Sequence, residues 1–206
     1  MSNISIGNMT LGIYQTNCYF VYREDSDKVL VFDPADHGKK IEAALGHHGL
    51  HTVAIFLTHG HFDHIGGCAE LKAAADAYAG EHGWEPVKIY AGEAEKDFLR
   101  DTKSNLSKDM GRPVTVTADV YLQDGEELNL DGIRIKVLAT PGHTAGSEMC
   151  IRDRTYRGRC QLLFPGGRVL NLRGYPVPGI RGQNRFPHRQ YEYTGTLGEG
   201  EAVYSA

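Results

Sequence analysis

The residue types best suited to chemistry lie in one short stretch. Residues 58–64 read Thr-His-Gly-His-Phe-Asp-His and place four ligand-type side chains, His59, His61, Asp63 and His64, within six positions. Imidazole nitrogens and a carboxylate oxygen suit zinc and similar divalent ions. Single histidines are common in surface loops, but four ligand types directly after the apolar, strand-like run 53–57 favour a metal site. We therefore predict that this loop binds metal.

A second segment points to the same chemistry. Residues 137–140 read as a strand, and they run into Pro-Gly-His-Thr-Ala-Gly-Ser at 141–147. Small residues in such a turn let a backbone or a ligand approach closely. His143 alone would be a weak signal. Paired with the first loop, it is the natural third nitrogen for a site that already holds His59 and His61.

Together these two motifs resemble the metallo-β-lactamase superfamily, and within it the glyoxalase II-like (hydroxyacylglutathione hydrolase-like) branch rather than the true β-lactamases. Residues 15–19 (Gln-Thr-Asn-Cys-Tyr), 31–34 (Val-Phe-Asp-Pro) and 124–128 fit the same pattern. The resemblance covers residues 8 to about 150. It implies an αββα sandwich with metal ions at one edge, an α/β fold of layered α+β type whose second half is incomplete in this chain.

The resemblance also implies two metal positions. His59, His61 and His143 would hold the first ion, and Asp63 and His64 the second. The family pattern adds a bridging aspartate from a Gly-Asp-Thr-Leu-Phe-like strand and a last histidine from a glycine-rich turn. After Ser147 there is no Gly-Asp pair, and His188 stands in Phe-Pro-His-Arg without glycines. We expect one or two Zn²⁺ ions, with iron or manganese as alternatives.

The function implied is a metal-dependent hydrolase that attacks a thioester or related acyl carbonyl with a zinc-bound hydroxide. Asp63 would be catalytic by orienting the water, and Asp33 would be either a partner of a ligand or a turn cap. Two alternatives stay open: an iron-dependent persulfide dioxygenase, and an inactive truncated or frameshifted product. A nuclease of the same superfamily would need an added nucleic-acid domain, which this sequence does not show.

Composition changes abruptly near residue 150. Residues 1–150 carry 13 basic and 22 acidic side chains, whereas residues 151–206 carry 9 and 4, and all nine of these bases are arginine. Codons compatible with residues 173–205, read one nucleotide forward, permit the missing Gly-Asp-Thr-Leu-Phe and Gly-Arg-Thr-Asp stretches in order. Residues 148–154 resemble translated sequencing adapter. We therefore divide the chain into a metallo-β-lactamase-like part, 1–150, and an aberrant, frameshifted and poorly ordered tail, 151–206.

General properties of the chain limit the kinds of partner that it is expected to have. A length of 206 residues allows one domain with a substantial core, and the net charge of −4 gives no reason to expect nucleic acid or an anionic membrane. No apolar run approaches the roughly 20 residues that span a bilayer. The four cysteines lack disulfide-like spacing, and residues 1–5 lack an export pattern, so a cytoplasmic location is expected. The expected partner is a small-molecule substrate, and the oligomeric state is left open.

The pattern along the chain alternates strands and helices. Strands are expected at 11–22, 29–33, 53–57, 87–90 and 137–140, helices at 37–48, 67–78 and 92–100, and a polar loop at 101–117 that could overhang the site. Cys68 could be a soft ligand, but packing on the inner face of a helix is favoured. The remaining histidines before the second motif are read as solvated: His37, His47, His48, His51 and His82.

Overall fold

The structure, a computed structural model, describes residues 4–139, 144, 159–164 and 168–173. Its first sheet has six strands in the order β1 (Ile4–Leu11), β2 (Thr16–Arg23), β3 (Lys28–Phe32), β4 (His51–Leu57), β5 (Lys88–Gly92) and β6 (Val120–Leu122). Its second sheet has four, in the spatial order β10 (Arg168–Arg173), β9 (Arg159–Phe164), β8 (Ile133–Leu138) and β7 (Glu127–Leu130). The helical elements are α1 (Gly38–His47), α2 (Phe62–Ile65), α3 (Cys68–His82) and the 3₁₀ turns η1 (Glu93–Glu95) and η2 (Phe98–Arg100).

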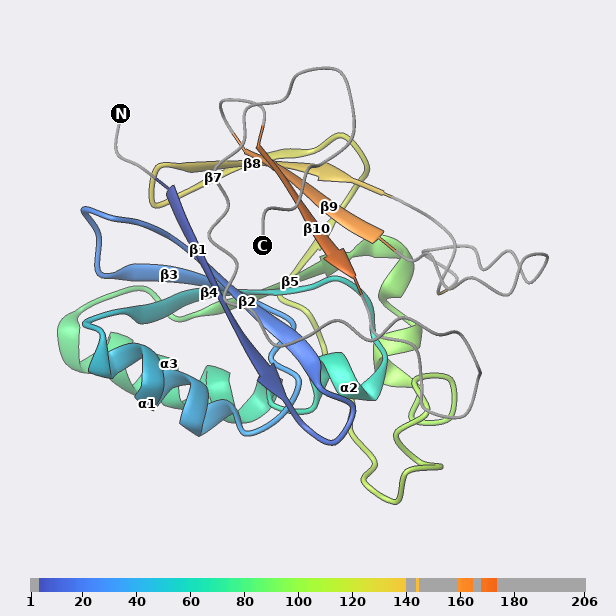
Figure 1. The fold of residues 1–206 in the computed structure, drawn as a ribbon. Helices are drawn as coiled ribbons and strands as arrows, with labels where there is room; N and C mark the ends of the chain where they lie inside the picture. The colour runs from blue at the N-terminus through green and yellow to red at the C-terminus, as the bar shows by residue number, and fades with distance from the viewer. Residues whose placement is uncertain (1–3, 140–143, 145–158, 165–167, 174–206) are drawn as a thin grey trace, which may run out of the picture.

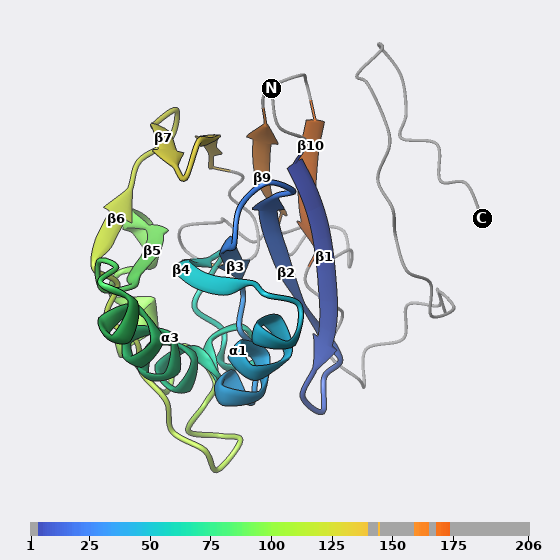
Figure 2. The ribbon, with the colours of Figure 1, turned by 90° about the vertical axis from the view of Figure 1, so that its left-hand side faces the viewer.

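Side chains that alternate along the strands of the first sheet pack against a different layer on each face. On β3, Val29 and Val31 pack with residues of α1 and α3, whereas Leu30 and Phe32 pack with residues of β8 in the second sheet. Successive side chains of a strand point to opposite faces, so a strand buried on both faces reads as a continuous apolar run. Figures 1 and 2 show the two long helices on one face of the first sheet and the second sheet on the other. The described helices thus supply one outer layer of the expected αββα sandwich.

Strand direction fixes where the site lies. β3, β4, β5 and β6 run parallel, and β2 runs antiparallel to β3. Because the carboxyl ends of parallel strands meet at one edge, the residues that follow β3, β4 and β5 are brought together there, next to the start of β2. That edge therefore gathers Asp33, the loop that begins at Thr58, and η1.

Several element predictions are confirmed, and others need correction. Of the strand expected at 137–140, residues 137 and 138 are the end of β8, which begins at Ile133. The strand expected at 11–22 is instead the end of β1, a turn at 12–15 and then β2, because Gly12 and Gln15 adopt positive φ angles of 69° and 56°. The helix expected at 92–100 is a pair of 3₁₀ turns. Most of β1 was not foreseen, since glycine and asparagine interrupt its apolar alternation, yet it pairs with β2 along its whole length.

His51 was predicted to be solvated, and the structure contradicts this prediction. Its ring stacks on Tyr78 with centroids 3.3 Å apart, and its Nδ1 lies 3.1 Å from a carboxylate oxygen of Glu42. His51 opens β4 at the edge opposite the metal loop, where α1 and α3 cover it. The other four histidines of that group are exposed, as predicted: His37, His47, His48 and His82.

Part of the predicted tail is described. β9 and β10 form an antiparallel hairpin, and β9 pairs with β8 from Lys136↔Leu163 to Leu138↔Gln161. Poor order was expected for residues 151–206, and for the rest of that range the expectation stays a prediction, because those residues lie outside the described ones. None of the described helices is long and apolar enough to cross a membrane.

The two long helices meet where neither has room for a side chain. A Cβ built on Gly38 would lie 2.1 Å from the carbonyl oxygen of Gly67 and 2.3 Å from the amide nitrogen of Leu71. We expect Gly38→Ala to destabilise the fold by about 1–3 kcal/mol, since backbone must move to admit the methyl group. Gly80 is exposed in α3 with open space around it, so Gly80→Ala is expected to stabilise by about 0.5–1 kcal/mol. Urea unfolding of both variants checks the pair, and equal midpoints would contradict the close approach.

Candidate metal centre

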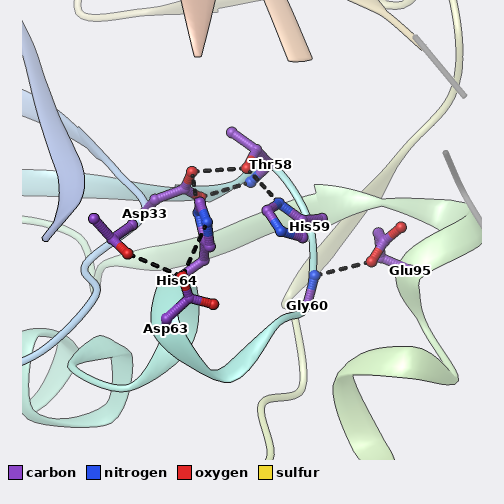
Figure 3. A network of polar contacts seen from close by, with 8 residues as sticks. Asp33, Thr58, His59, Gly60, Asp63, His64 and Glu95 are labelled. Atoms are coloured by element: carbon purple, nitrogen blue, oxygen red, sulfur yellow. Dashed lines mark hydrogen bonds and ion pairs between the residues drawn. The ribbon is translucent and has the colours of Figure 1, made fainter. Parts of the chain in front are cut away.

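Asp33 fixes the first residue of the metal loop. It follows β3, is 2% exposed and has a left-handed φ of 52°. The Thr58 amide donates to its Oδ1 at 2.8 Å, and the Thr58 hydroxyl donates to its Oδ2 at 2.7 Å. The loop therefore leaves β4 in a conformation set by the neighbouring strand end (Figure 3).

The same carboxylate orients His64. This histidine lies in α2, is 4% exposed, and its Nδ1 stands 2.9 Å from Asp33 Oδ2. A carboxylate only accepts hydrogen bonds, so Nδ1 carries the proton and Nε2 keeps its lone pair. Burial alone would lower the pKa of His64, but the charge and hydrogen bond of Asp33, with the charge of Asp63, raise this pKa above its usual value. Asp33 thus contacts His64 and also accepts the Thr58 amide at the turn, and the role of His64 as a ligand stays a prediction.

A hydroxyl relay orients His59 in the same sense. Its Nδ1 lies 3.0 Å from the Thr58 hydroxyl, whose single proton goes to Asp33. The hydroxyl must then accept from Nδ1–H, which leaves Nε2 of His59 as the nitrogen with a lone pair. That nitrogen is buried. Asp33 thus sets the tautomer of two imidazoles, one directly and one through Thr58.

The three imidazoles of the loop are neighbours. The ring of His59 lies 4.9 Å from that of His61, nearly perpendicular to it, and 4.0 Å from that of His64. His61 also packs edge-on against Phe98 of η2, with centroids 5.1 Å apart. The structure therefore brings the three imidazoles of the loop together, and their binding of a cation stays a prediction.

Asp63 accepts a hydrogen bond from a residue of β2 that the sequence did not single out. The hydroxyl of Thr16, which is 1% exposed at the start of β2, donates to Asp63 Oδ2 at 2.9 Å. The same oxygen lies 3.7 Å from Nε2 of His64. Thr16 belongs to the Gln-Thr-Asn-Cys motif, and that motif was the signal that could have assigned it to the site.

Glu95 is a further residue that sequence reasoning missed. It stands among charged neighbours in Glu-Ala-Glu-Lys-Asp at 93–97, and nothing marks it in the sequence. In the structure it is 3% exposed, and it accepts a hydrogen bond from the Gly60 amide at 2.9 Å. Figure 3 shows this carboxylate approaching the loop from the side opposite Asp33.

Two other expected ligands have different outcomes. His143 lies outside the described residues, so its part in the site stays a prediction. Cys68 is fully buried as the first residue of α3, and burial raises the pKa of its thiol to about 12. Because metals bind the thiolate, this environment disfavours Cys68 as a ligand and confirms the packing role.

The donor set fits a divalent cation. Among the described residues, no group of three or more His, Cys, Asp or Glu side chains is placed so that it could hold a metal ion. The side chains predicted as ligands remain candidates: the imidazoles of His59 and His61 lie together, and so do the side chains of Asp63 and His64. Nitrogen lone pairs fixed by second partners, with an adjacent carboxylate, are the ligands that zinc and iron take in proteins.

Comparison with known families assigns the chain. Residues 11–154 match the metallo-beta-lactamase superfamily, and this match covers more than half of the sequence. The chain therefore belongs to the metallo-beta-lactamase superfamily, as the two motifs predicted.

Two curated relatives belong to hydrolase branches. The chain is 35% identical over 163 residues to the probable metallo-hydrolase YqgX of Bacillus subtilis, across 77% of this chain and 71% of that protein. It is 30% identical over 161 residues to the hydroxyacylglutathione hydrolase GloC of Haemophilus influenzae, across 75% and 69%. The glyoxalase II-like resemblance is thereby confirmed at the level of sequence similarity.

Solved structures confirm the fold class. BLEG-1, a B3 metallo-beta-lactamase, superposes with a TM-score of 0.59 at 30% identity, over 77% of this chain and 66% of its own. TTHA1623, solved in a di-iron-bound form, superposes with a TM-score of 0.52 at 29% identity, over 68% and 63%. This chain thus spans about two thirds of each of these two chains.

Proposed function

We propose that this chain is a metal-dependent hydrolase for a thioester or related acyl substrate. The first cation would be held by His59, His61 and His143, and the second by Asp63 and His64. The observation that carries the proposal is the Asp33–Thr58 pair, which presents Nε2 of both His59 and His64 as ligand atoms. Superfamily membership and the hydroxyacylglutathione hydrolase among the relatives support the acyl substrate class.

When bound, a zinc ion would supply an acidified water as the nucleophile and a Lewis acid for the acyl oxygen. The remaining tasks fall to the chain itself. Asp63 accepts a hydrogen bond from Thr16 on one oxygen, and its other oxygen could accept a hydrogen bond from the attacking water and so orient it. With Nδ1 carrying the proton of each neutral ring, Nε2 of His59 and of His64 would be the nitrogen available to a cation.

A substrate panel tests the proposal on the full chain. Metal content is measured first, and the loaded protein is then offered acyl-glutathione thioesters, a β-lactam, and a glutathione persulfide with oxygen. We expect thiol release from a thioester, with zinc as the metal that supports it. Oxygen consumption with iron would favour the persulfide dioxygenase instead, and β-lactam opening without thiol release would refute the thioester as the substrate.

We also propose that residues beyond about 150 derive from a shifted reading frame. The change in charge and arginine usage supports this, as does the end of the family match at residue 154. The described hairpin of β9 and β10 contains no His, Asp or Glu, so it supplies neither the bridging aspartate nor the last histidine. The nucleotide sequence decides the matter: absence of Gly-Asp-Thr-Leu-Phe from the neighbouring frame would end the idea.

A further inference from the structure

A buried carboxylate outside the expected ligand set links the two ligand-bearing loops. Oε2 of Glu95 accepts the amide of Gly60, which stands between His59 and His61. Oε1 of the same residue accepts the hydroxyl of Thr144, which is itself buried. Thr144 directly follows His143 in the sequence. One side chain of η1 therefore contacts both segments from which the first cation would take its nitrogens.

We propose that Glu95 is a positioning residue that sets the spacing between the His59–His61 turn and the segment carrying His143. This inference rests on the proposed function, because it concerns the same cation site. His143 itself lies outside the described residues. Its chain neighbour Thr144 donates a hydrogen bond to Glu95, which also accepts the Gly60 amide of the first loop.

Packing shows that the first loop is docked on the segment that contains Glu95. A Cβ on Gly60 would lie 2.8 Å from Cδ1 of Phe98 and 3.1 Å from Cδ2 of Leu99, so glycine allows the turn to rest directly on η2. The ring of His61 packs against Phe98 as well. Residues 93–100 thus form a platform beneath the turn, and Glu95 is the part of the platform that also reaches Thr144.

A second backbone anchor makes the turn rigid without involving Thr144. The amide of Phe62 donates to the carbonyl oxygen of Asn105 at 3.0 Å, and Asn105 is fully buried in the loop that follows η2. The loop expected to overhang the site therefore contacts it through the main chain. With the backbone of the turn held at Gly60 and Phe62, the Glu95–Thr144 hydrogen bond couples it, within the described residues, to the second loop.

The chemistry of a carboxylate suits this task. A buried acid is costly unless its oxygens accept hydrogen bonds, and Glu95 accepts one on each oxygen. Two donors can therefore approach from different loops. A metal site needs its ligands within a few tenths of an ångström of their ideal distances, so a link between two loops affects affinity more than it affects the fold.

Substitutions at Thr144 test the link with little change in volume. Thr144→Val removes the hydroxyl, and Thr144→Ser keeps it. In the full chain loaded with Co²⁺, we expect Thr144→Val to weaken cation affinity by about 10–100-fold, the usual loss when a partner behind the ligands is removed, and to change the visible absorption spectrum. Thr144→Ser should keep both the affinity and the spectrum of the parent. Urea unfolding of the metal-free proteins measures the purely structural effect.

Variants of Glu95 complete the design. Glu95→Gln keeps an acceptor for Gly60, and its amide can donate to the Thr144 hydroxyl, so it should retain most of the affinity. Glu95→Ala removes both contacts and should lose most of the cation affinity. A parent chain that binds no cation would overturn the proposed function and this inference together. A parent that binds Co²⁺ while Thr144→Val keeps the same affinity and spectrum would overturn the inference alone.

Discussion

Alanine in place of His61 should abolish stoichiometric cation binding and turnover. His61 is one of three imidazoles expected at the first cation, and its ring stands 4.9 Å from that of His59. Loss of a partner behind a ligand costs about 10–100-fold in metal affinity, so loss of a ligand itself should cost at least about 100-fold. Zinc competition with a chelator and thiol release from an acyl thioester measure the two effects.

His61 separates ligand loss from damage to the fold better than His59 does. His61 is only half-buried, whereas His59 is 7% exposed and lies against His64. Truncation of a buried ring leaves a cavity, and the cavity alone destabilises a protein. His61→Ala should therefore lose the cation while its urea midpoint stays close to that of the parent.

His47 provides the matched control. It is exposed in the last turn of α1, which starts after β3 at the metal edge and carries this residue to the opposite edge. His47→Ala removes an imidazole without touching the predicted ligands, so zinc content and turnover should equal those of the parent. Identical zinc affinity in the His61 and His47 variants would show that the loop does not bind the cation.

The candidate ligands could be singled out from the sequence because they lie close together in it. His59, His61, Asp63 and His64 fall within six positions, and an apolar strand directly precedes them. The residues that orient the ligands are remote from them in sequence. Thr16 lies 47 positions from Asp63, and Glu95 lies 49 positions from Thr144. Sequence periodicity carries no information on such pairs, since they arise only when the edges of parallel strands meet.

The layers were predictable for a related reason. Continuous apolar runs such as Val-Leu-Val-Phe at 29–32 indicate strands buried on both faces, and such strands imply helices on one side and another layer on the other. The environment of His51 could not be read in this way. Its contacts with Glu42 and Tyr78 depend on how α1 and α3 close over the start of β4, which is a matter of tertiary packing.

Asparagine in place of Asp33 should prevent Nε2 of His64 from binding a metal ion, although no atom of that histidine is removed. The Thr58 amide needs an acceptor at the position of Oδ1, so the amide nitrogen of asparagine must take the place of Oδ2. It would then donate toward Nδ1 of His64. The proton of the ring moves to Nε2, and a protonated nitrogen cannot bind a metal ion.

The expected loss of affinity in Asp33→Asn reflects the changed hydrogen bond to His64 and not a strained backbone. We expect a loss in cation affinity of about 10–100-fold, as for other partners that orient a ligand. The backbone itself should tolerate the change, because Asp33 has a φ of 52° and asparagine adopts that region readily. Long-range ¹H–¹⁵N spectra of the histidine rings report the tautomer directly, and chelator competition reports the affinity.

The chain contains its own control for Asp33→Asn. At the other end of β4, the buried carboxylate of Glu42 accepts from the Thr52 hydroxyl at 2.5 Å and from Nδ1 of His51 at 3.1 Å. Asp33 meets Thr58 and His64 in the same pattern at the carboxyl end of the strand. Glu42→Gln should therefore lower stability by about 1–3 kcal/mol, as expected for a disturbed buried hydrogen-bond pair, yet leave cation affinity unchanged. If both variants weaken cation binding equally, general loosening of the sheet explains the loss, and the tautomer argument for Asp33 is wrong.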